Sequence, residues 1–136
     1  KAVEGDAWDR LIDTLDVLAE KEETRTVLRT TCIEGLNMDH PEWFASMFQR
    51  AKPDFVELKA YMHVGHSRGR LDRDSMPEHE RVLEFAEEVM EHMPDHDVLK
   101  GVPPSRVALL SKTEDTWVPK LKKDSEFWER DPVTGD

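Results

Sequence analysis

Residues 55–71, FVELKAYMHVGHSRGRL, place ionisable side chains at alternating positions of one segment. One set of alternating residues is apolar: Val56, Leu58, Ala60, Met62 and Val64. The other set consists of Phe55, Glu57, Lys59, Tyr61 and His63. A period of two residues predicts a strand with one apolar and one polar face. On the polar face, an amine can offer charge to a carboxylate or phosphate, and a phenol can donate a hydrogen bond.

Two interpretations of this polar face remain open. It is either the wet side of an edge strand or the lining of a polar cavity with a charged mouth. The helices predicted before and after this strand in the sequence favour the cavity. Functional groups in parallel α/β proteins also gather at the carboxyl ends of strands, where Lys59, Tyr61 and His63 lie. Arg29, in the preceding predicted strand, either faces the same cavity or pairs with Glu57.

The strand runs into a loop that carries Arg68, Arg70 and Arg73. The chain of 136 residues has 30 acidic and 19 basic side chains and a net charge of −11, so a cation-rich loop is unusual in it. Such a loop is what contact with RNA phosphate requires. The alternative is a solvated loop whose arginines pair with Asp72 and Asp74.

Length and composition predict one domain with a hydrophobic core. The single cysteine, Cys32, excludes an internal disulfide and indicates a reducing, cytoplasmic compartment. No apolar stretch has the length of a membrane span. Acidic residues spread over every predicted helix favour a halophilic source, and we expect the melting temperature to rise with added potassium chloride. Because the chain starts at Lys1 rather than Met, we expect it to be a piece of a longer protein.

Hydrophobic periodicity and capping residues predict alternating helices and strands. The predicted elements are a helix from Asp6 to about Glu20, a strand over 24–33, a helix over 40–52, the strand from Phe55, a helix from Asp74 or Ser75 to Pro94, and a strand over 105–112. Alternation at these lengths predicts parallel strands joined by right-handed crossovers. Residues 1–112 form this unit, and 113–136 are predicted to be an irregular extension.

Apolar residues at helical spacing predict which helix faces are buried. In the first helix these are Trp8, Leu11, Ile12, Leu15 and Leu18. In the second they are Trp43, Phe44, Met47, Phe48 and Ala51. In the third they are Val82, Phe85, Ala86, Val89, Met90 and Met93. Cys32 is expected to be a small buried hydrophobic residue.

Four segments of the chain resemble a known family: RTTCIEGLNM, PDFVELKAYMHVGHSRGRL, MPEHERVLEFA and PSRVALLS. They are similar to the archaeal 4-demethylwyosine synthases, over most of Ala7 to Lys112. These are radical S-adenosylmethionine lyases that act on transfer RNA for phenylalanine, where they condense N1-methylguanosine with pyruvate. The resemblance implies an α/β fold that is the carboxyl-terminal part of a partial (βα)₆ TIM-like barrel. The N-terminal remainder of the same enzyme is then a partner.

The resemblance also implies cofactors that this chain cannot hold alone. In the family, a [4Fe–4S] cluster on a Cys-x₃-Cys-x₂-Cys motif cleaves S-adenosylmethionine, and a second cluster helps to hold pyruvate. A cluster needs several thiolates, whereas this chain has Cys32 alone. The cluster ligands and the lysine that meets pyruvate are therefore expected upstream of Lys1.

Site residues carry over from the family motifs. Ile33 and Gly35 match the part of the fold that holds the adenine of S-adenosylmethionine, where glycine permits close approach, and Asn37 matches the family's Trp-Asn-Met position with Leu36 in place of the aromatic residue. Lys59 and Tyr61, of the KAY motif, are predicted to be catalytic or substrate-contacting residues. The predicted substrate and transfer RNA contacts are Arg29, Glu57, Ser67, Arg68 and Arg70.

Other interpretations of these patterns remain. The chain could be a non-catalytic RNA-binding module of the same architecture, or an unrelated α/β enzyme. His63 with His66, and His92 with His96, have metal-ligand spacing, but no carboxylate or cysteine completes a set, and no metal site is predicted.

Overall fold

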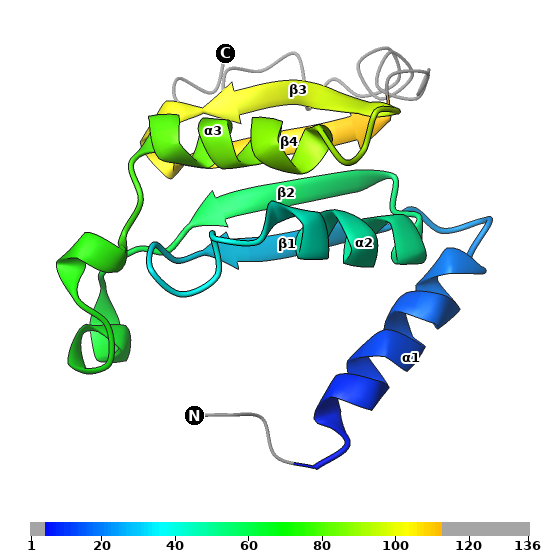
Figure 1. Ribbon diagram of the computed structural model, residues 1–136, viewed down its shortest axis with the longest axis horizontal. Helices are drawn as coiled ribbons and strands as arrows, with labels where there is room; N and C mark the ends of the chain where they lie inside the picture. The colour runs from blue at the N-terminus through cyan, green and yellow to red at the C-terminus, as the bar shows by residue number, and fades with distance from the viewer. Residues whose placement is uncertain (1–4, 113–136) are drawn as a thin grey trace, which may run out of the picture.

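The computed structural model describes residues 5–112, with the backbone alone at Leu99 and Lys100, as helices packed on a four-stranded sheet (Figure 1). The helices and strands in chain order are α1 (Ala7–Ala19), β1 (Val27–Cys32), α2 (Pro41–Ala51), β2 (Phe55–Ala60), α3 (His79–Met90), β3 (His96–Val102) and β4 (Val107–Lys112). The predicted extension over 113–136 lies outside the described residues.

The sheet has the strand order β1-β2-β4-β3. β1 and β2 pair in parallel, with Val27 opposite Phe55, and α2 connects them as a βαβ unit. β4 pairs antiparallel with both β2 and β3, so β1, β2 and β3 run one way and β4 runs the other (Figure 1). The prediction of an all-parallel sheet is therefore wrong for β4, while the α/β class is confirmed.

The sequence pattern missed β3 for a local reason. A register shift between Val98 and Lys100 interrupts the alternation of side chains that marks a strand. A short 3₁₀ turn over Pro103–Ser105 then leads into β4, with Arg106 in the left-handed backbone region at φ 49°. This turn makes β3 and β4 a hairpin, where the sequence pattern predicted only a connection rich in glycine and proline.

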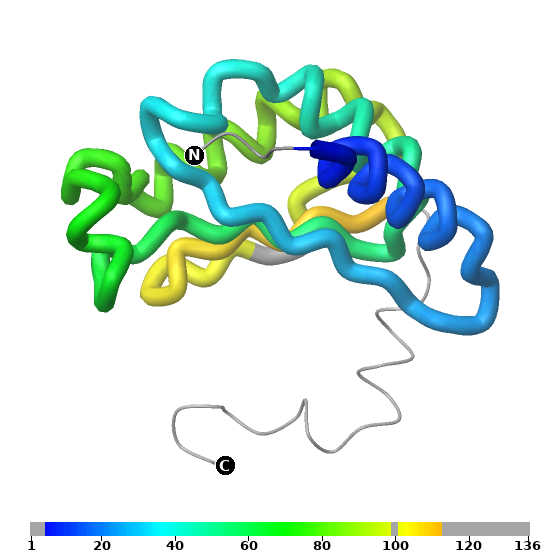
Figure 2. The backbone as a smooth tube through the Cα atoms, turned by 90° about the horizontal axis from the view of Figure 1, so that it is seen from below, coloured from blue at the N-terminus to red at the C-terminus, as the bar shows by residue number. Residues whose placement is uncertain are grey.

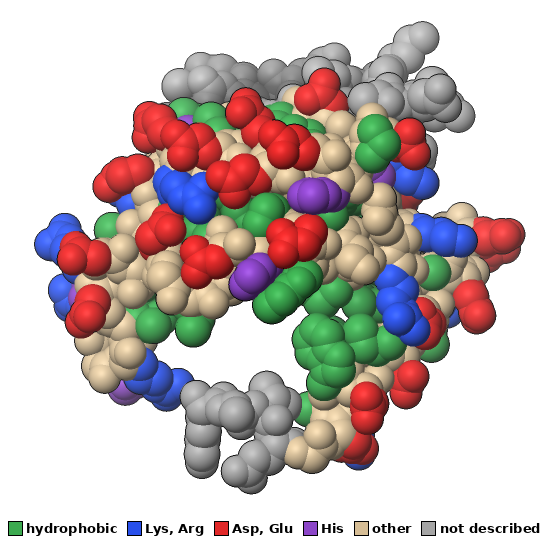
Figure 3. All heavy atoms as spheres, in the orientation of Figure 1, with side chains coloured by type: hydrophobic (Ala, Val, Ile, Leu, Met, Phe, Trp, Pro, Cys, Tyr) green, Lys and Arg blue, Asp and Glu red, His purple; other side chains and the backbone are tan. Residues whose placement is uncertain are grey.

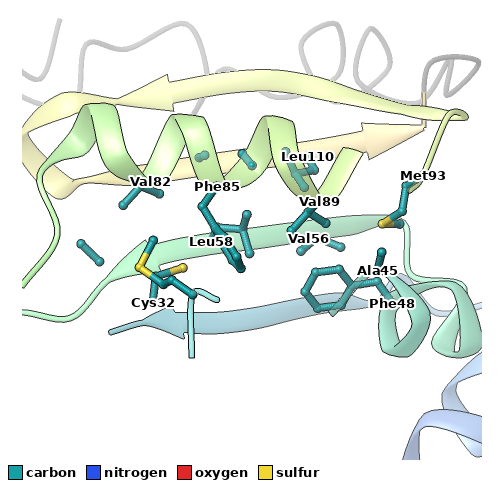
Figure 4. Packing of buried hydrophobic residues seen from close by; sticks show 14 residues of the cluster. Cys32, Ala45, Phe48, Val56, Leu58, Val82, Phe85, Val89, Met93 and Leu110 are labelled. Atoms are coloured by element: carbon teal, nitrogen blue, oxygen red, sulfur yellow. The ribbon is translucent and has the colours of Figure 1, made fainter. Parts of the chain in front are cut away.

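One side of β2 forms the centre of the hydrophobic core. Val56, Leu58 and Ala60 are fully buried against α2 and α3, as predicted (Figure 4). The rest of the cluster consists of Cys32, Met38, Ala45, Phe48, Val82, Phe85, Ala86, Val89, Met93, Ala108 and Leu110. Met62 and Val64 were expected on the same face but are exposed, because they lie beyond the end of the strand.

The first two helices bury less of their apolar surface than their spacing predicts. In α1 only Leu15 is buried and Trp8 is exposed, since the helix leans away from the sheet toward its amino end (Figure 1). In α2, Trp43 is 62% exposed and stacks on His40, with ring centroids 3.7 Å apart. The predicted burial of these two tryptophans is wrong.

The predicted start of the third helix is also wrong. Asp74 and Ser75 do not cap α3, because Arg73–Ser75 forms a separate 3₁₀ turn and α3 begins at His79. Met76 precedes Pro77 and is held in an extended conformation (φ −87°, ψ 103°), as residues before proline commonly are. That extended residue separates the turn from the helix.

Candidate nucleic-acid interface

The carboxyl ends of β1 and β2 lie at one edge of the sheet, and two loops meet there. The main-chain N–H of Glu34, after β1, donates to the carbonyl of Ser75, after β2, at 2.9 Å. Arg81 of α3 forms an ion pair with Glu34 at 3.1 Å and also donates to the carbonyl of Met38. Parallel strands predicted this convergence, and α3 fixes the first loop in place.

The loop after β1 is shaped by its own residues. Asn37 accepts a hydrogen bond from the N–H of Ile33 at 2.8 Å and donates to the carbonyl of Thr31 at 2.9 Å. Gly35 has a φ of +77°, which favours glycine, and no atom lies within 4 Å of the place where a Cβ would be. Thus Asn37 holds the loop, while the space beside Gly35 is open.

The helices cover one side of the sheet (Figure 2). The polar residues of β2 alternate with Val56, Leu58 and Ala60, which pack against those helices, and therefore belong to the opposite face. Glu57 is 28% exposed in its side chain and forms an ion pair with Arg29 of β1 at 3.1 Å. Lys59 is half-buried between the strand positions of Thr31 and Val107. Arg29 therefore pairs with Glu57, which is one of the two roles that the sequence left open for it.

Tyr61 connects β2 to the loop that follows it. Its side chain is 6% exposed, and its hydroxyl donates to Ser67 Oγ at 3.0 Å and lies 3.1 Å from His63 Nδ1. Its main-chain N–H donates to the carbonyl of Cys32 at 2.8 Å. Tyr61 and Ser67 are thus brought into direct contact, and His63, absent from the predicted site, joins them.

We call residues 65–75 the arginine loop. It consists of two 3₁₀ turns, Gly65–Gly69 and Arg73–Ser75, and projects beyond the sheet edge (Figure 1). Arg68, Arg70 and Arg73 are all exposed there. Basic and acidic side chains are interspersed at this projection, whereas acidic side chains dominate the surface over α3 (Figure 3).

The arginines of this loop differ from the rest in their pairing. Elsewhere in the described chain, carboxylates pair at 2.6–3.3 Å with Arg10, Arg29, Arg50, Arg81 and Arg106. Arg25 also has a partner. Within residues 5–112, neither Asp72, Asp74 nor any other carboxylate pairs with Arg68, Arg70 or Arg73. The predicted pairing of these arginines with Asp72 and Asp74 is therefore wrong, while their exposure agrees with a solvated loop.

Two clefts of the described residues lie away from this region. A cleft of about 490 Å³ lies between α1 and α2, and one of about 230 Å³ lies near Met93 and His96. Neither is lined by Glu57, Lys59 or Tyr61. The four described strands do not close on themselves, so the predicted polar cavity remains a prediction.

The residues of this chain do not fit an iron–sulfur cluster. Cys32 is completely buried in the core, and burial raises the pKa of its thiol to about 12, which disfavours the thiolate that binds iron. Among the residues that the structure describes, no three His, Cys, Asp or Glu side chains are grouped to hold a metal ion. Nor does any helix in this range have the length and apolarity to cross a bilayer.

Part of the chain matches a known protein family. Residues 50–112, from the end of α2 to the end of β4, match the sequence model of a family described as wyosine base formation. This range contains β2, the arginine loop and α3.

Individual relatives narrow this similarity. The chain is 41% identical over 109 residues to the S-adenosyl-L-methionine-dependent tRNA 4-demethylwyosine synthase of Pyrococcus horikoshii, covering 80% of this chain and 32% of the relative. The synthase of Methanocaldococcus jannaschii is 39% identical over 114 residues, covering 84% and 35%. A solved structure of TYW1 with a lysine-pyruvate adduct bound has a TM-score of 0.69 and 37% identity, covering 80% of this chain and 34% of that one.

The predicted family resemblance is confirmed: the chain is homologous to the carboxyl-terminal region of tRNA 4-demethylwyosine synthases. It spans about a third of the length of the Pyrococcus horikoshii and Methanocaldococcus jannaschii synthases. The alternative of an unrelated α/β enzyme is therefore wrong.

Proposed function

We propose that this chain forms the carboxyl-terminal wall of a radical S-adenosylmethionine enzyme that makes 4-demethylwyosine from N1-methylguanosine and pyruvate, on transfer RNA for phenylalanine. The names of the relatives and the lysine-pyruvate adduct in a structural neighbour support this proposal. In it, the sheet continues a partial (βα)₆ barrel and the polar face of β2 lines the interior. The upstream remainder of the same enzyme completes the site.

In this proposal, S-adenosylmethionine supplies the radical that starts the chemistry, and the iron–sulfur ligands come from outside this chain. Ile33 and Gly35 follow β1, where the carboxyl ends of β1 and β2 meet. The open space beside Gly35 leaves room for the adenine group. Asn37 contributes by holding their loop through its bonds to Ile33 and Thr31. Lys59 provides a cation on the interior face, and the Arg29–Glu57 pair lies beside it.

The single observation that supports transfer RNA contact is the unpaired charge of the arginine loop. Ion pairs within residues 5–112 do not account for these three exposed arginines, whereas they do account for Arg10, Arg29, Arg50, Arg81 and Arg106. Phosphate oxygens are the natural partners of such guanidinium groups, which can bind them through two parallel hydrogen bonds. We therefore propose that Arg68 and Arg70 bind phosphates of the transfer RNA and that Arg73 adds to the local positive charge.

The test is a salt series of transfer RNA affinity, because each lost phosphate contact reduces the slope of log affinity against log salt. Arg68→Ala with Arg70→Ala should weaken binding at least about tenfold near physiological salt and reduce the slope by roughly 1.5. Arg50→Ala is the matched control, since Arg50 is also exposed but is paired with Asp16 at 2.6 Å. Unchanged affinity and slope in the double variant would remove the RNA role from this loop.

A second assay separates an enzyme from a non-catalytic RNA-binding module. The full-length protein that joins this chain to the upstream region of its relatives should form 4-demethylwyosine on transfer RNA carrying N1-methylguanosine. Mass spectrometry of the digested nucleosides detects the product. Binding of transfer RNA without product would favour the docking module.

A further inference from the structure

A chain of hydrogen bonds joins the end of β2 to the first turn of the arginine loop. Ser67 Oγ donates to the carbonyl of Val64 at 2.5 Å. Tyr61 Oη donates to Ser67 Oγ at 3.0 Å and lies 3.1 Å from His63 Nδ1. Tyr61 is buried, and its main-chain N–H is hydrogen-bonded to Cys32 of β1, so the hydrogen-bond chain is anchored in the core at this end.

The direction of these hydrogen bonds determines which ring nitrogen of His63 carries a proton. A hydroxyl has one proton to donate, and Ser67 gives its proton to Val64, so Ser67 accepts from Tyr61. Tyr61 has then used its own proton, and its oxygen accepts from His63 Nδ1–H. In the neutral ring, Nε2 must therefore be the unprotonated nitrogen. The imidazolium also carries a proton on Nδ1, so the chain persists in either state.

Ser67 links this chain to the arginines themselves. Its main-chain carbonyl accepts hydrogen bonds from the N–H groups of Arg70 at 2.9 Å and Leu71 at 3.0 Å. Its side chain is held by Tyr61, while its carbonyl holds the backbone that carries Arg70. Arg68 lies one residue beyond Ser67, so the positions of both cations depend on this one residue.

We propose that Tyr61, His63 and Ser67 are positioning residues that hold the arginine loop in its phosphate-binding conformation before RNA arrives. This inference rests on the proposed binding of phosphate by Arg68 and Arg70. A loop that is already ordered avoids the loss of conformational entropy that would otherwise oppose binding. Tyr61 and Ser67 thereby act through the arginines, in place of the direct substrate and RNA contacts predicted from the sequence.

The test compares the positioning variants with the arginine variants in the same transfer RNA salt series. Tyr61→Phe removes one oxygen and keeps the buried ring, and it should weaken affinity roughly three- to tenfold, the effect of one lost hydrogen bond. Its salt slope should equal that of the unchanged protein, since no charge is lost. Ser67→Ala should behave alike, and Ser67→Thr, which keeps the hydroxyl, should retain affinity.

A spectroscopic measurement reports on the hydrogen-bond chain without RNA. In ¹⁵N spectra of the histidine rings at mildly alkaline pH, His63 should show a protonated Nδ1 and an unprotonated Nε2. Tyr61→Phe should shift His63 toward the Nε2–H form, which is the more common one in water. A predominant Nε2–H form in the unchanged protein would overturn the assigned direction of the chain.

The outcomes separate this inference from the proposed function. If the arginine variants lose affinity and slope while Tyr61→Phe and Ser67→Ala bind normally, the loop contacts RNA but the positioning role is overturned. If the arginine variants bind normally, the RNA role of the loop fails and the positioning role fails with it. Weaker binding by Tyr61→Phe at an unchanged slope supports both.

Discussion

The two faces of β2 differ in burial and in the kind of side chain that they carry. Toward the helices, Val56, Leu58 and Ala60 are completely buried in a continuous apolar cluster. On the opposite face, Glu57 and Lys59 remain half-buried, with side chains that can bind polar groups. Packing of the apolar face holds the strand in one register. The side chains of the other face therefore also have fixed positions.

A similar contrast separates the arginines of the molecule. Arg81 is surrounded by Glu34 and Glu88 and holds α3 to the loop after β1. Arg68 and Arg70 have no such carboxylates in the described chain. Arginines that stabilise the fold are thus distinguished from arginines available to a ligand by their partners and not by their exposure alone.

The largest expected effect comes from the polar face of β2. Lys59→Met in the full-length enzyme keeps the length of the side chain and removes its charge. We expect product formation to fall by about a hundredfold or more, the usual cost of losing a positioned charge in an active site. The yield of 4-demethylwyosine per enzyme measures this, and the unfolding midpoint in urea checks that the fold is intact. Normal turnover would show that Lys59 is not part of the site.

Substitutions on the buried face of β2 should instead lower the stability of the fold. Leu58→Ala leaves a cavity beneath α3 and should reduce the free energy of unfolding by about 3 kcal/mol. Glu57→Gln, one position away on the other face, is the control and should change it by less than about 0.5 kcal/mol. Urea unfolding at constant m value measures both. Equal effects of the two substitutions would contradict the assignment of the faces.

The buried thiol gives a test at alkaline pH. Burial raises the pKa of Cys32 from 9.0 to about 12, so the folded protein keeps a proton that the unfolded chain loses above about pH 9. The thiol therefore contributes stability below pH 9, and this contribution is lost as pH rises from 9 toward 12, by up to about 1.4 kcal/mol per pH unit.

Cys32→Ala should flatten this loss when the unfolding free energies of both proteins are compared at pH 8 and about pH 10. Subtracting the two profiles removes every contribution that the two proteins share. Parallel profiles would show that the thiol ionises as readily in the folded protein as in the unfolded chain, which contradicts its burial.

The sequence predicted the features of this protein that depend on short-range periodicity. Alternation over 55–60 identified the strand and its two faces, and the βαβ order placed the ends of β1 and β2 together. The reversed direction of β4 could not be predicted, because a bulge at Val98 hid its hairpin partner. Burial of Trp43 failed for another reason: helical periodicity marks an apolar face but does not say what covers it.

For the candidate site, the sequence predicted individual residues but not the contacts between them. Family motifs selected Tyr61 and Ser67, but their mutual hydrogen bond depends on the 3₁₀ turn that brings residues six positions apart into contact. The side chain of Asn37 holds its loop through two hydrogen bonds, and its predicted role in cofactor binding stays a prediction. Motifs thus selected residues, and the coordinates add which of them contact one another.

The smallest expected effect concerns the ion pair between Arg29 and Glu57. Because Arg29 is largely exposed and water screens the pair, a double-mutant cycle with alanine should give a coupling free energy of only about 0.5 kcal/mol. The coupling should disappear in 1 M salt, where the screening length is only about 3 Å. A coupling above about 2 kcal/mol that persists in salt would mean that this face is shielded from water in the folded chain. Both faces of β2 would then be buried, and the contrast between an apolar packing face and a water-exposed polar face would fail.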